Sequence, residues 1–422
     1  MSTAADAEST AANSSYRDVL LRNPRMAGLL LGDLLANAGT GMLIVAMPVQ
    51  TLAIHGTVDE ALAIGMVEAA PFLLSTVLAL AISLGRFSAP PRLLLLADCA
   101  LRAVAFTGLG VLALADRLTL PVLIGGLLLG STCRMAGSSS RRLLATSMVD
   151  DADLFAVNGL LGLGSNLALY VVGPVTGGLL VAWAGAGWAL FADACGALIL
   201  LASVLWCVPR ASAVRAAGGR GPRRESGWRI LRRRPVAGRL LVVVFFFNFL
   251  YMPIEVALPL YVRGTLHTGA SGLGLLWTAL GVGALAGAAL VDRLRNLPQR
   301  PLLVAIIALW ALCPIALAGV AHQVAAMVVF GIGGLVWAPF TPIAYSFLQS
   351  GLDPGEQQPV VTLWTTGSTV AAPLGLLAGG PLIALTGIHT SLVLSGLMTL
   401  LLAPLAAWGV LARAGDRREV SP

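Results

Sequence analysis

Long apolar runs separated by short polar segments are the feature that most constrains how this chain can fold. Twelve such runs hold about 20 residues or more, and a helix that rises 1.5 Å per residue crosses roughly 30 Å of hydrocarbon with about 20 residues. Only 11% of the 422 residues are charged, against roughly 25% in an average soluble protein. Because the chain cannot cover a water-exposed surface, the sequence predicts an all-α polytopic membrane protein.

The twelve predicted helices form two groups of six on either side of a polar break. The first group is expected at residues 26–53, 61–84, 93–115, 119–145, 155–182 and 187–207. The second group is expected at residues 238–262, 270–291, 301–320, 323–349, 358–386 and 390–412. We therefore predict a disordered tail at 1–24, an N-terminal bundle at 25–207, a flexible basic connector at 208–237, a C-terminal bundle at 238–412 and a tail at 413–422.

The basic residues indicate which side of the membrane each loop occupies. All 27 are Arg, and 23 of them fall in the tails, the connector and the alternate loops of one side. Only Arg117 and Arg263 are expected on the opposite side. Because basic loops resist translocation, both termini are predicted to be cytoplasmic. Since this charge is confined to loops between apolar runs, we do not expect nucleic acid as a partner.

Several chemistries lack the residues that they need. Without Lys the chain has neither a P-loop nor a Schiff-base linkage to a cofactor. The five Cys lie inside apolar runs, and the four His belong to four different loops without the spacing of metal ligands. We therefore expect no cofactor and no metal site. A polytopic membrane enzyme would need a clustered nucleophile or metal site, and neither a zincin motif nor a nucleophile elbow is present.

The two halves of the chain repeat each other. A shift of 211 positions pairs Pro48 with Pro259 and Asn37 with Asn248. Parallel repeats joined by a basic loop are typical of secondary transporters, in which two bundles rock about a site near the membrane midplane. The repeat therefore favours transport by alternating access.

The fifth predicted helix carries the most specific motif, which consists of Gly164, Gly173, Pro174, Gly177 and Gly178. Glycine lets a neighbouring helix approach closely, and proline permits a bend, so plain helix packing is one interpretation. The motif also resembles the fifth-helix antiporter motif of the major facilitator superfamily, and the resemblance covers the chain from about Arg25 to Arg413. The branch it resembles comprises bacterial drug and siderophore exporters, such as macrolide-efflux and enterobactin exporters. This resemblance implies two pseudo-symmetric six-helix bundles in a bacterial cytoplasmic membrane, export rather than uptake, and a monomer.

Charged side chains inside predicted helices are candidates for proton coupling, because each costs about 2.5 to 3.5 kcal/mol at the bilayer centre on insertion scales. Asp33 on the first helix could take up a proton from outside and surrender it as substrate leaves. Arg134 loosely matches the family's fourth-helix Arg motif and could be the partner of Asp33. Glu68 and Glu255, toward the outer side, could also accept a proton. For each of these residues a structural ion pair is the alternative.

Four further charges are predicted to have gating or structural roles, namely Asp98, Arg102, Asp292 and Arg293. Asp98 and Arg102 are four residues apart on one helix and are expected to pair with each other. Asp292 and Arg293 resemble the acid and base of the family's loop between the second and third helices of a bundle. The equivalent loop of the first half, at 84–87, lacks the acid.

A largely hydrophobic cavity for a bulky substrate is predicted from polar and aromatic side chains on the first, seventh and tenth helices. Its candidate lining residues are Asn37, Phe247, Asn248, Tyr251, Trp337 and Phe340. Core packing is the alternative for each of the aromatic residues.

Together these features predict a proton-coupled antiporter that exports an amphipathic small molecule, such as an antibiotic, another drug or a siderophore. Its expected partners are the lipid bilayer, the small-molecule substrate and protons. Two alternatives stay open: a proton-coupled uptake symporter, and a protein of another class, either a membrane enzyme or a membrane protein that transports nothing.

Overall fold

The structure is a computed structural model that describes residues 20, 22–83, 86–87, 89–150, 153–209, 226–294 and 296–407. Most of both predicted tails, much of the predicted connector and part of the 84–87 loop lie outside these residues. Within them the chain forms helices and no strand. In the described part of the chain, twelve helical segments are long and apolar enough to cross a membrane, which confirms the predicted fold class.

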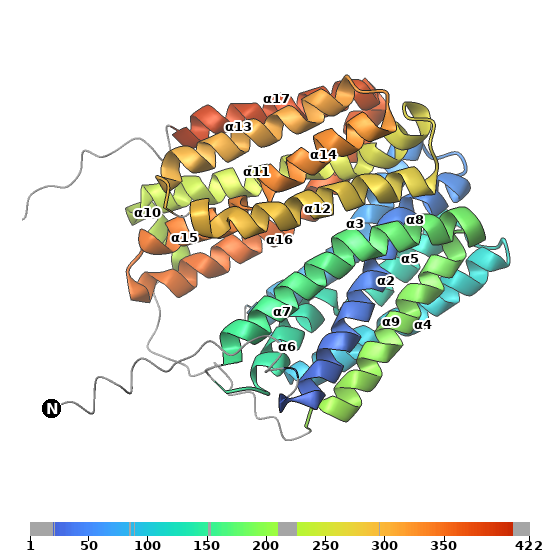
Figure 1. Cartoon of the computed structure of the whole chain (residues 1–422), viewed down its shortest axis with the longest axis horizontal. Helices are drawn as coiled ribbons and strands as arrows, with labels where there is room; N and C mark the ends of the chain where they lie inside the picture. The colour runs from blue at the N-terminus through green and yellow to red at the C-terminus, as the bar shows by residue number, and fades with distance from the viewer. Residues whose placement is uncertain are drawn as a thin grey trace, which may run out of the picture. The chain divides into compact units, whose positions relative to one another are not determined.

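The first six spans follow the predicted ranges closely (Figure 1). They comprise α2 (Pro24–Ile54), α3 (Glu60–Ser83), α4 (Pro91–Leu114), α5 with α6 (Leu120–Gly130 and Arg134–Thr146), α7 with η2 and α8 (Leu154–Leu167, Ala168–Val172 and Gly173–Ala184), and α9 (Ala186–Cys207). The short helix α10 (Gly227–Arg233) lies in the predicted connector.

The other six spans also match their predicted ranges. They comprise α11 (Pro235–Gly264), α12 (Ala270–Leu294), α13 (Gln299–Ala318), α14 with α15 (Gln323–Trp337 and Phe340–Ser350), α16 (Pro354–Thr386) and α17 (Ile388–Ala406). The fourth span of each half is broken near its middle, once before Arg134 and once at Pro339. This shared break agrees with the repeat that the sequence predicts.

The chain contacts divide into two compact units. Unit 1 comprises Met1–Ala46 and Pro71–Gly219, and unit 2 comprises Met47–Ala70 and Arg220–Pro422. The end of α2 and the start of α3 thus group with the second half, whereas the sequence places both helices wholly in the N-terminal bundle. Close packing accompanies this grouping, because a Cβ atom added to Gly65 on α3 would lie 2.8 Å from the carbonyl oxygen of Leu376 on α16. Arg263 at the end of α11 also forms an ion pair with Glu60.

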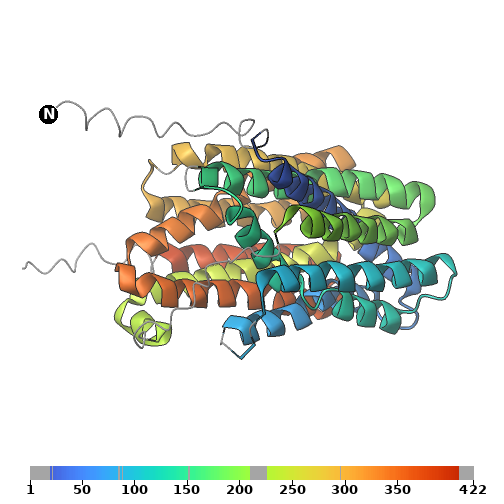
Figure 2. The ribbon, with the colours of Figure 1, turned by 90° about the horizontal axis from the view of Figure 1, so that it is seen from below.

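Close approach between α2 and α8 organises unit 1. A Cβ atom added to Gly173 would lie 2.6 Å from the carbonyl oxygen of Ala38, so only glycine fits there. Pro174 follows it and has no N–H to donate, and the five preceding residues, Ala168–Val172, widen into a π-helix. The predicted Gly-Pro motif is therefore a packing contact with the first membrane helix. Elsewhere in this unit α4 lies beside α5 in both views (Figures 1 and 2).

Unit 2 depends on an equally close contact between α12 and α14. A Cβ atom on Gly334 would lie 3.0 Å from the backbone nitrogen of Ala284 and would also meet the carbonyl oxygen of Leu280. Both obstacles are backbone atoms, which cannot rotate away. Small residues at such a crossing let helices approach in a bilayer, where lipid is as apolar as the side chains.

Replacing the crossing glycine should destabilise the protein. We expect Gly334→Ala to cost about 1 to 3 kcal/mol, as overpacking does, and to lower the midpoint of thermal unfolding of the purified protein in detergent. The control is Gly125→Ala on α5, where an added Cβ would meet no atom within 4 Å. Because Ala favours a helix over Gly by up to about 1 kcal/mol, this control should be neutral or stabilising. Equal midpoints for the two variants would contradict the crossing geometry.

Candidate functional site

A buried carboxylate on α2 is the centre of a polar network in unit 1. Asp33 lies about two turns into the helix and exposes only 2% of its surface. Its Oδ1 accepts from the guanidinium of Arg141 on α6, and its Oδ2 accepts from the hydroxyl of Ser165 on α7 at 2.9 Å. The amide of Asn37, one turn further along α2, donates to the same carboxylate at 3.0 Å. Three helices thus supply partners to both oxygens of one carboxylate.

This network borders a cavity of about 700 Å³, which is within the range of pockets that hold drug-sized ligands. The lining residues are Asp33, Asn37, Ser138, Ser139, Arg141, Arg142, Leu143, Leu161, Gly162, Ser165, Asn166 and Leu169. They combine a few apolar side chains with hydroxyl, amide and guanidinium groups. The cavity can therefore hold a molecule with both apolar and polar parts, in direct contact with the Asp33–Arg141 ion pair.

A second ion pair lies deeper in the same unit. Arg102 on α4 binds Asp193 on α9, with 2.7 Å between Nε and Oδ2, and Asp193 is fully buried. The same guanidinium donates to the hydroxyl of Thr40 and to the carbonyl oxygen of Ala36, at 3.0 Å, on α2. Arg102 therefore ties three helices together through hydrogen bonds from Nε and one terminal nitrogen of its guanidinium group.

The pair predicted between Asp98 and Arg102 does not form. Although the two lie four residues apart, the long Arg102 side chain reaches Asp193 on another helix, where it forms a two-point contact with the carboxylate. Asp98 is buried, with 3% exposed, and its Oδ1 has no hydrogen-bond partner among the described residues. The spacing correctly places Asp98 and Arg102 one turn apart on the same helix, but the predicted partner of Arg102 was wrong.

Arg134, predicted to partner Asp33, takes a different place. It begins α6, and its guanidinium carbon lies 5.1 Å from the centre of the Phe72 ring, a cation–π contact. No carboxylate among the described residues lies within ion-pair distance of it. Among its described residues, unit 1 thus has two closed ion pairs, and Asp98 and Arg134 each belong to neither of them.

Sequence reasoning missed the residue that pairs with Asp33. We counted Arg141 among the loop arginines, but it lies in α6 and exposes 13% of its side chain. One signal was available, because Arg141 follows Arg134 by seven residues and therefore shares its helix face. Ser165 was also missed, since a single serine near a glycine-rich helix carries no distinctive pattern.

The predicted substrate-cavity residues separate into two groups. Asn37 lines the cavity in unit 1. In unit 2, Phe247 and Phe340 are buried with ring centres 4.0 Å apart, so they are core residues that join α11 to α15. Tyr251 is also buried, with Trp337 stacked on its ring, and Asn248 donates to the carbonyl oxygen of Val244 within α11.

The other predicted charges belong to unit 2. Glu68 on α3 and Glu255 on α11 are half-buried, and each has an interaction partner. Asp292 and Arg293 are exposed in the last turn of α12. Asp33 and Arg134 therefore lie in one unit, and Glu68 and Glu255 in the other.

Comparison with known proteins identifies the family. A family model described as Major Facilitator Superfamily matches residues 29–358. The chain belongs to the major facilitator superfamily. It is therefore a multi-pass membrane transporter and not an enzyme, as the sequence predicts.

Two relatives in this superfamily are drug exporters by name. The chain is 29% identical to the multidrug efflux pump Tap of Mycolicibacterium fortuitum over 413 residues, which cover 90% of this chain and 94% of the relative. It is 27% identical to the multidrug efflux pump Tap of Mycobacterium tuberculosis over 386 residues, which cover 86% of this chain and 88% of the relative.

Solved structures of other transporters share the fold. The nucleoside transporter NupG matches with a TM-score of 0.74 and 11% identity. The match covers 92% of this chain and 100% of NupG. A bacterial homologue of the human lysosomal transporter Spinster matches with a TM-score of 0.68 and 14% identity, over 92% and 96% of the two chains. At these identities the similarity shows the major facilitator fold alone.

The Arg102–Asp193 pair should be essential for stability. Asp193→Asn removes the carboxylate and leaves a buried guanidinium uncompensated, which typically costs 3 to 5 kcal/mol, so about that loss is expected. The control is Glu60→Gln, which breaks the exposed pair with Arg263 and should cost about 1 kcal/mol or less. Thermal unfolding and the yield of monodisperse protein measure both. A similar loss in the two variants would contradict a structural role specific to the buried pair.

Proposed function

We propose that this transporter is a proton-coupled antiporter that exports an amphipathic small molecule across a bacterial cytoplasmic membrane. One observation carries the proposal: the Asp33–Arg141 ion pair is buried in the span of the helices and also borders a cavity of ligand size. A proton and a substrate can both act on this pair. An antiporter that exchanges protons for substrate requires a site that responds to both.

The proposed coupling step is an exchange of partners. Protonation of Asp33 neutralises the carboxylate and releases Arg141, whose attraction to it is strong in a low-dielectric site. Asp98 packs against Gly137, one turn before Arg141 on α6, and its Oδ1 has no hydrogen-bond partner among the described residues. Arg141 can then turn from Asp33 toward Asp98, which changes the wall of the cavity. Substrate affinity therefore differs between the protonated and deprotonated states, which is the condition for coupling.

Export and the substrate class are supported by the relatives and by the fifth helix. The chain covers 94% and 88% of two relatives named as multidrug efflux pumps. The Gly-Pro motif, which resembles that of antiporters, forms the α2–α8 contact beside the network. The cavity wall combines leucine side chains with serine, asparagine and arginine, which suits a drug-like amphipathic molecule. We further propose that both termini are cytoplasmic, from the arginine distribution, and that the chain works as a monomer without a cofactor.

Asp33→Asn tests the proton carrier. A fluorescent amphipathic dye that the protein exports is first selected in cells lacking other pumps, and the purified protein is then assayed in sealed vesicles under an imposed proton gradient. We expect gradient-driven dye efflux to fall about tenfold or more, which corresponds to a loss of about 1.4 kcal/mol. Dye exchange without a gradient should persist, because Asn keeps a hydrogen bond to Ser165.

The control for this test is Asp116→Asn. Asp116 is exposed and has a positive φ of 53°, which Asn also tolerates, so this variant should pump normally. Full gradient-driven efflux by Asp33→Asn would contradict the assignment of Asp33. Dye accumulation along the proton gradient in wild-type vesicles would instead indicate a symporter.

The partner of Asp33 can be tested by a double variant. Arg141→Gln leaves the Asp33 carboxylate buried without its cation, so we expect a lower thermal midpoint than in the wild type. Adding Asp33→Asn removes the unpaired charge and should recover much of that loss, while gradient-driven efflux stays low. Additive losses of stability in the double variant would show that the two residues do not interact.

A further inference from the structure

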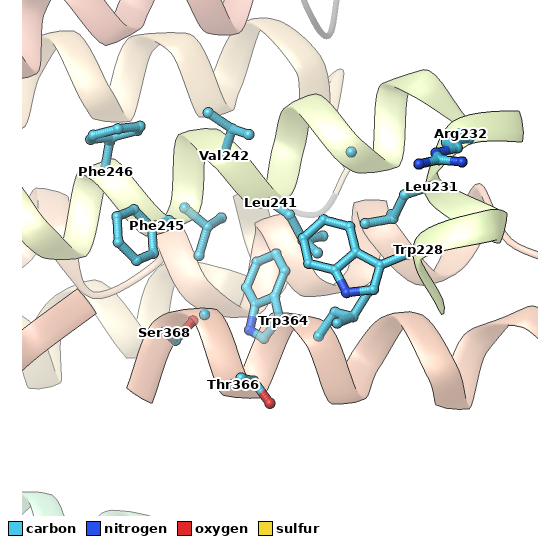
Figure 3. Close-up of a pocket in the computed structure, with 14 residues that line it drawn as sticks. Trp228, Leu231, Arg232, Leu241, Val242, Phe245, Phe246, Trp364, Thr366 and Ser368 are labelled. Carbon is cyan, nitrogen blue, oxygen red and sulfur yellow. The ribbon is translucent and has the colours of Figure 1, made fainter. Parts of the chain in front are cut away.

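A second cavity lies within unit 2, between the short helix α10, the first part of α11 and residues 363–368 of α16 (Figure 3). Its volume is about 720 Å³. We call it the α10 groove and define it by Trp228, Leu231 and Arg232 on α10, Leu241 and Phe245 on α11, and Trp364 on α16. Neither the Asp33 network nor the cavity beside it contributes to this groove, so transport as described above leaves it unexplained.

The lining of the groove is apolar along most of its length. Leu231 and Arg232 follow Trp228 by three and four residues, so all three side chains lie on the same side of α10. Figure 3 shows Trp228 extending from α10 toward α16, where Trp364 lies beside it. Along α11 the groove is lined from Gly238 to Phe246, which is about 12 Å at 1.5 Å per residue. An acyl chain is long enough to occupy it.

The mouth of the groove is basic. Arg229 and Arg232 are exposed, and neither forms an ion pair with a residue that the structure describes. Their neighbour Arg234 differs, because it binds Glu356 at 3.0 Å and Asp353 at 2.6 Å. Arg232 lines the groove, and Arg229 lies three residues before it on α10, so α10 offers two guanidinium groups that have no ion-pair partner among the described residues. The Trp228 side chain is 68% exposed, and exposed tryptophan is enriched at the level of lipid headgroups.

We propose that the α10 groove binds an anionic phospholipid from the leaflet on the basic side of the membrane. The phosphate lies at Arg229 and Arg232, and one acyl chain packs against Leu241, Phe245 and Trp364. Charge excludes a cationic amphipath, which both guanidinium groups would repel. The apolar walls exclude a free phosphate, which would leave them empty.

Binding can be measured by quenching of tryptophan fluorescence with brominated lipids. The full-length protein is placed in nanodiscs with a rising fraction of brominated phosphatidylglycerol or of brominated phosphatidylcholine. Both faces of a nanodisc are accessible, so the result does not depend on the orientation of the protein. The quenching that arises at Trp228 is the difference in quenching between the wild type and the Trp228→Phe variant. We use this difference as the signal from the groove.

We expect the Trp228 signal to reach half its maximum at a phosphatidylglycerol fraction at least about fivefold lower than that for phosphatidylcholine, since each arginine near an anionic surface contributes about that factor. Replacing both arginines, as Arg229→Gln with Arg232→Gln, should bring the two lipids to equal fractions. The matched control is Arg22→Gln with Arg25→Gln, which removes two exposed arginines of the same spacing from the start of α2 and should keep the preference.

Three results would overturn the proposal. The first is equal quenching by the two lipids in the wild type, as expected if a protein segment or a neutral molecule fills the groove. The second is a preference that survives loss of Arg229 and Arg232, or that the control variant loses equally. The third is a preference unaffected by Trp228→Phe, which would locate the lipid elsewhere.

Discussion

Compensation of charge between helices is the constraint on which the first unit depends. A lone ionised group is costly where no water can reach it, so the Asp33 and Asp193 carboxylates each require a cation from another helix. Arg141 reaches Asp33 from α6, and Arg102 reaches Asp193 from α4. Each pair thereby decides which helices lie together, since lipid offers no hydrophobic advantage to one apolar arrangement over another.

Close backbone packing sets the register in which those charges meet. Gly41 on α2 faces Gly173 on α8, and neither position has room for a side chain. This crossing lies two turns beyond Asp33, and Ser165 lies about two turns before Gly173 on the partner helix. The π-helix between Ser165 and Gly173 holds the serine against the carboxylate while the glycine stays at the crossing. Such π segments often accompany functional sites.

Sequence patterns predicted what each helix contains, but not which neighbour it meets. The twelve spans were predictable because length and hydropathy are local properties, and Asp33 was recognisable because a charge stands out in an apolar run. The partner of Arg102 was not, since Asp193 is 91 positions away and helix spacing favours the nearer Asp98. The grouping of Met47–Ala70 with the second half was equally hidden, because it depends on tertiary contacts of helix ends.

The charges that remain make this network easy to rearrange. Among the described residues of unit 1, the network involves three carboxylates (Asp33, Asp98 and Asp193) and three guanidinium groups (Arg102, Arg134 and Arg141). The two ion pairs leave Asp98 and Arg134 without a partner of opposite charge. A state in which Arg141 pairs with Asp98, and Asp33 carries a proton, has the same number of ion pairs as the state described here. The two states therefore differ by one proton and not by the loss of an interaction. A difference of that kind is small enough for a proton or a bound substrate to reverse, because a few kcal/mol suffices to invert a two-state equilibrium.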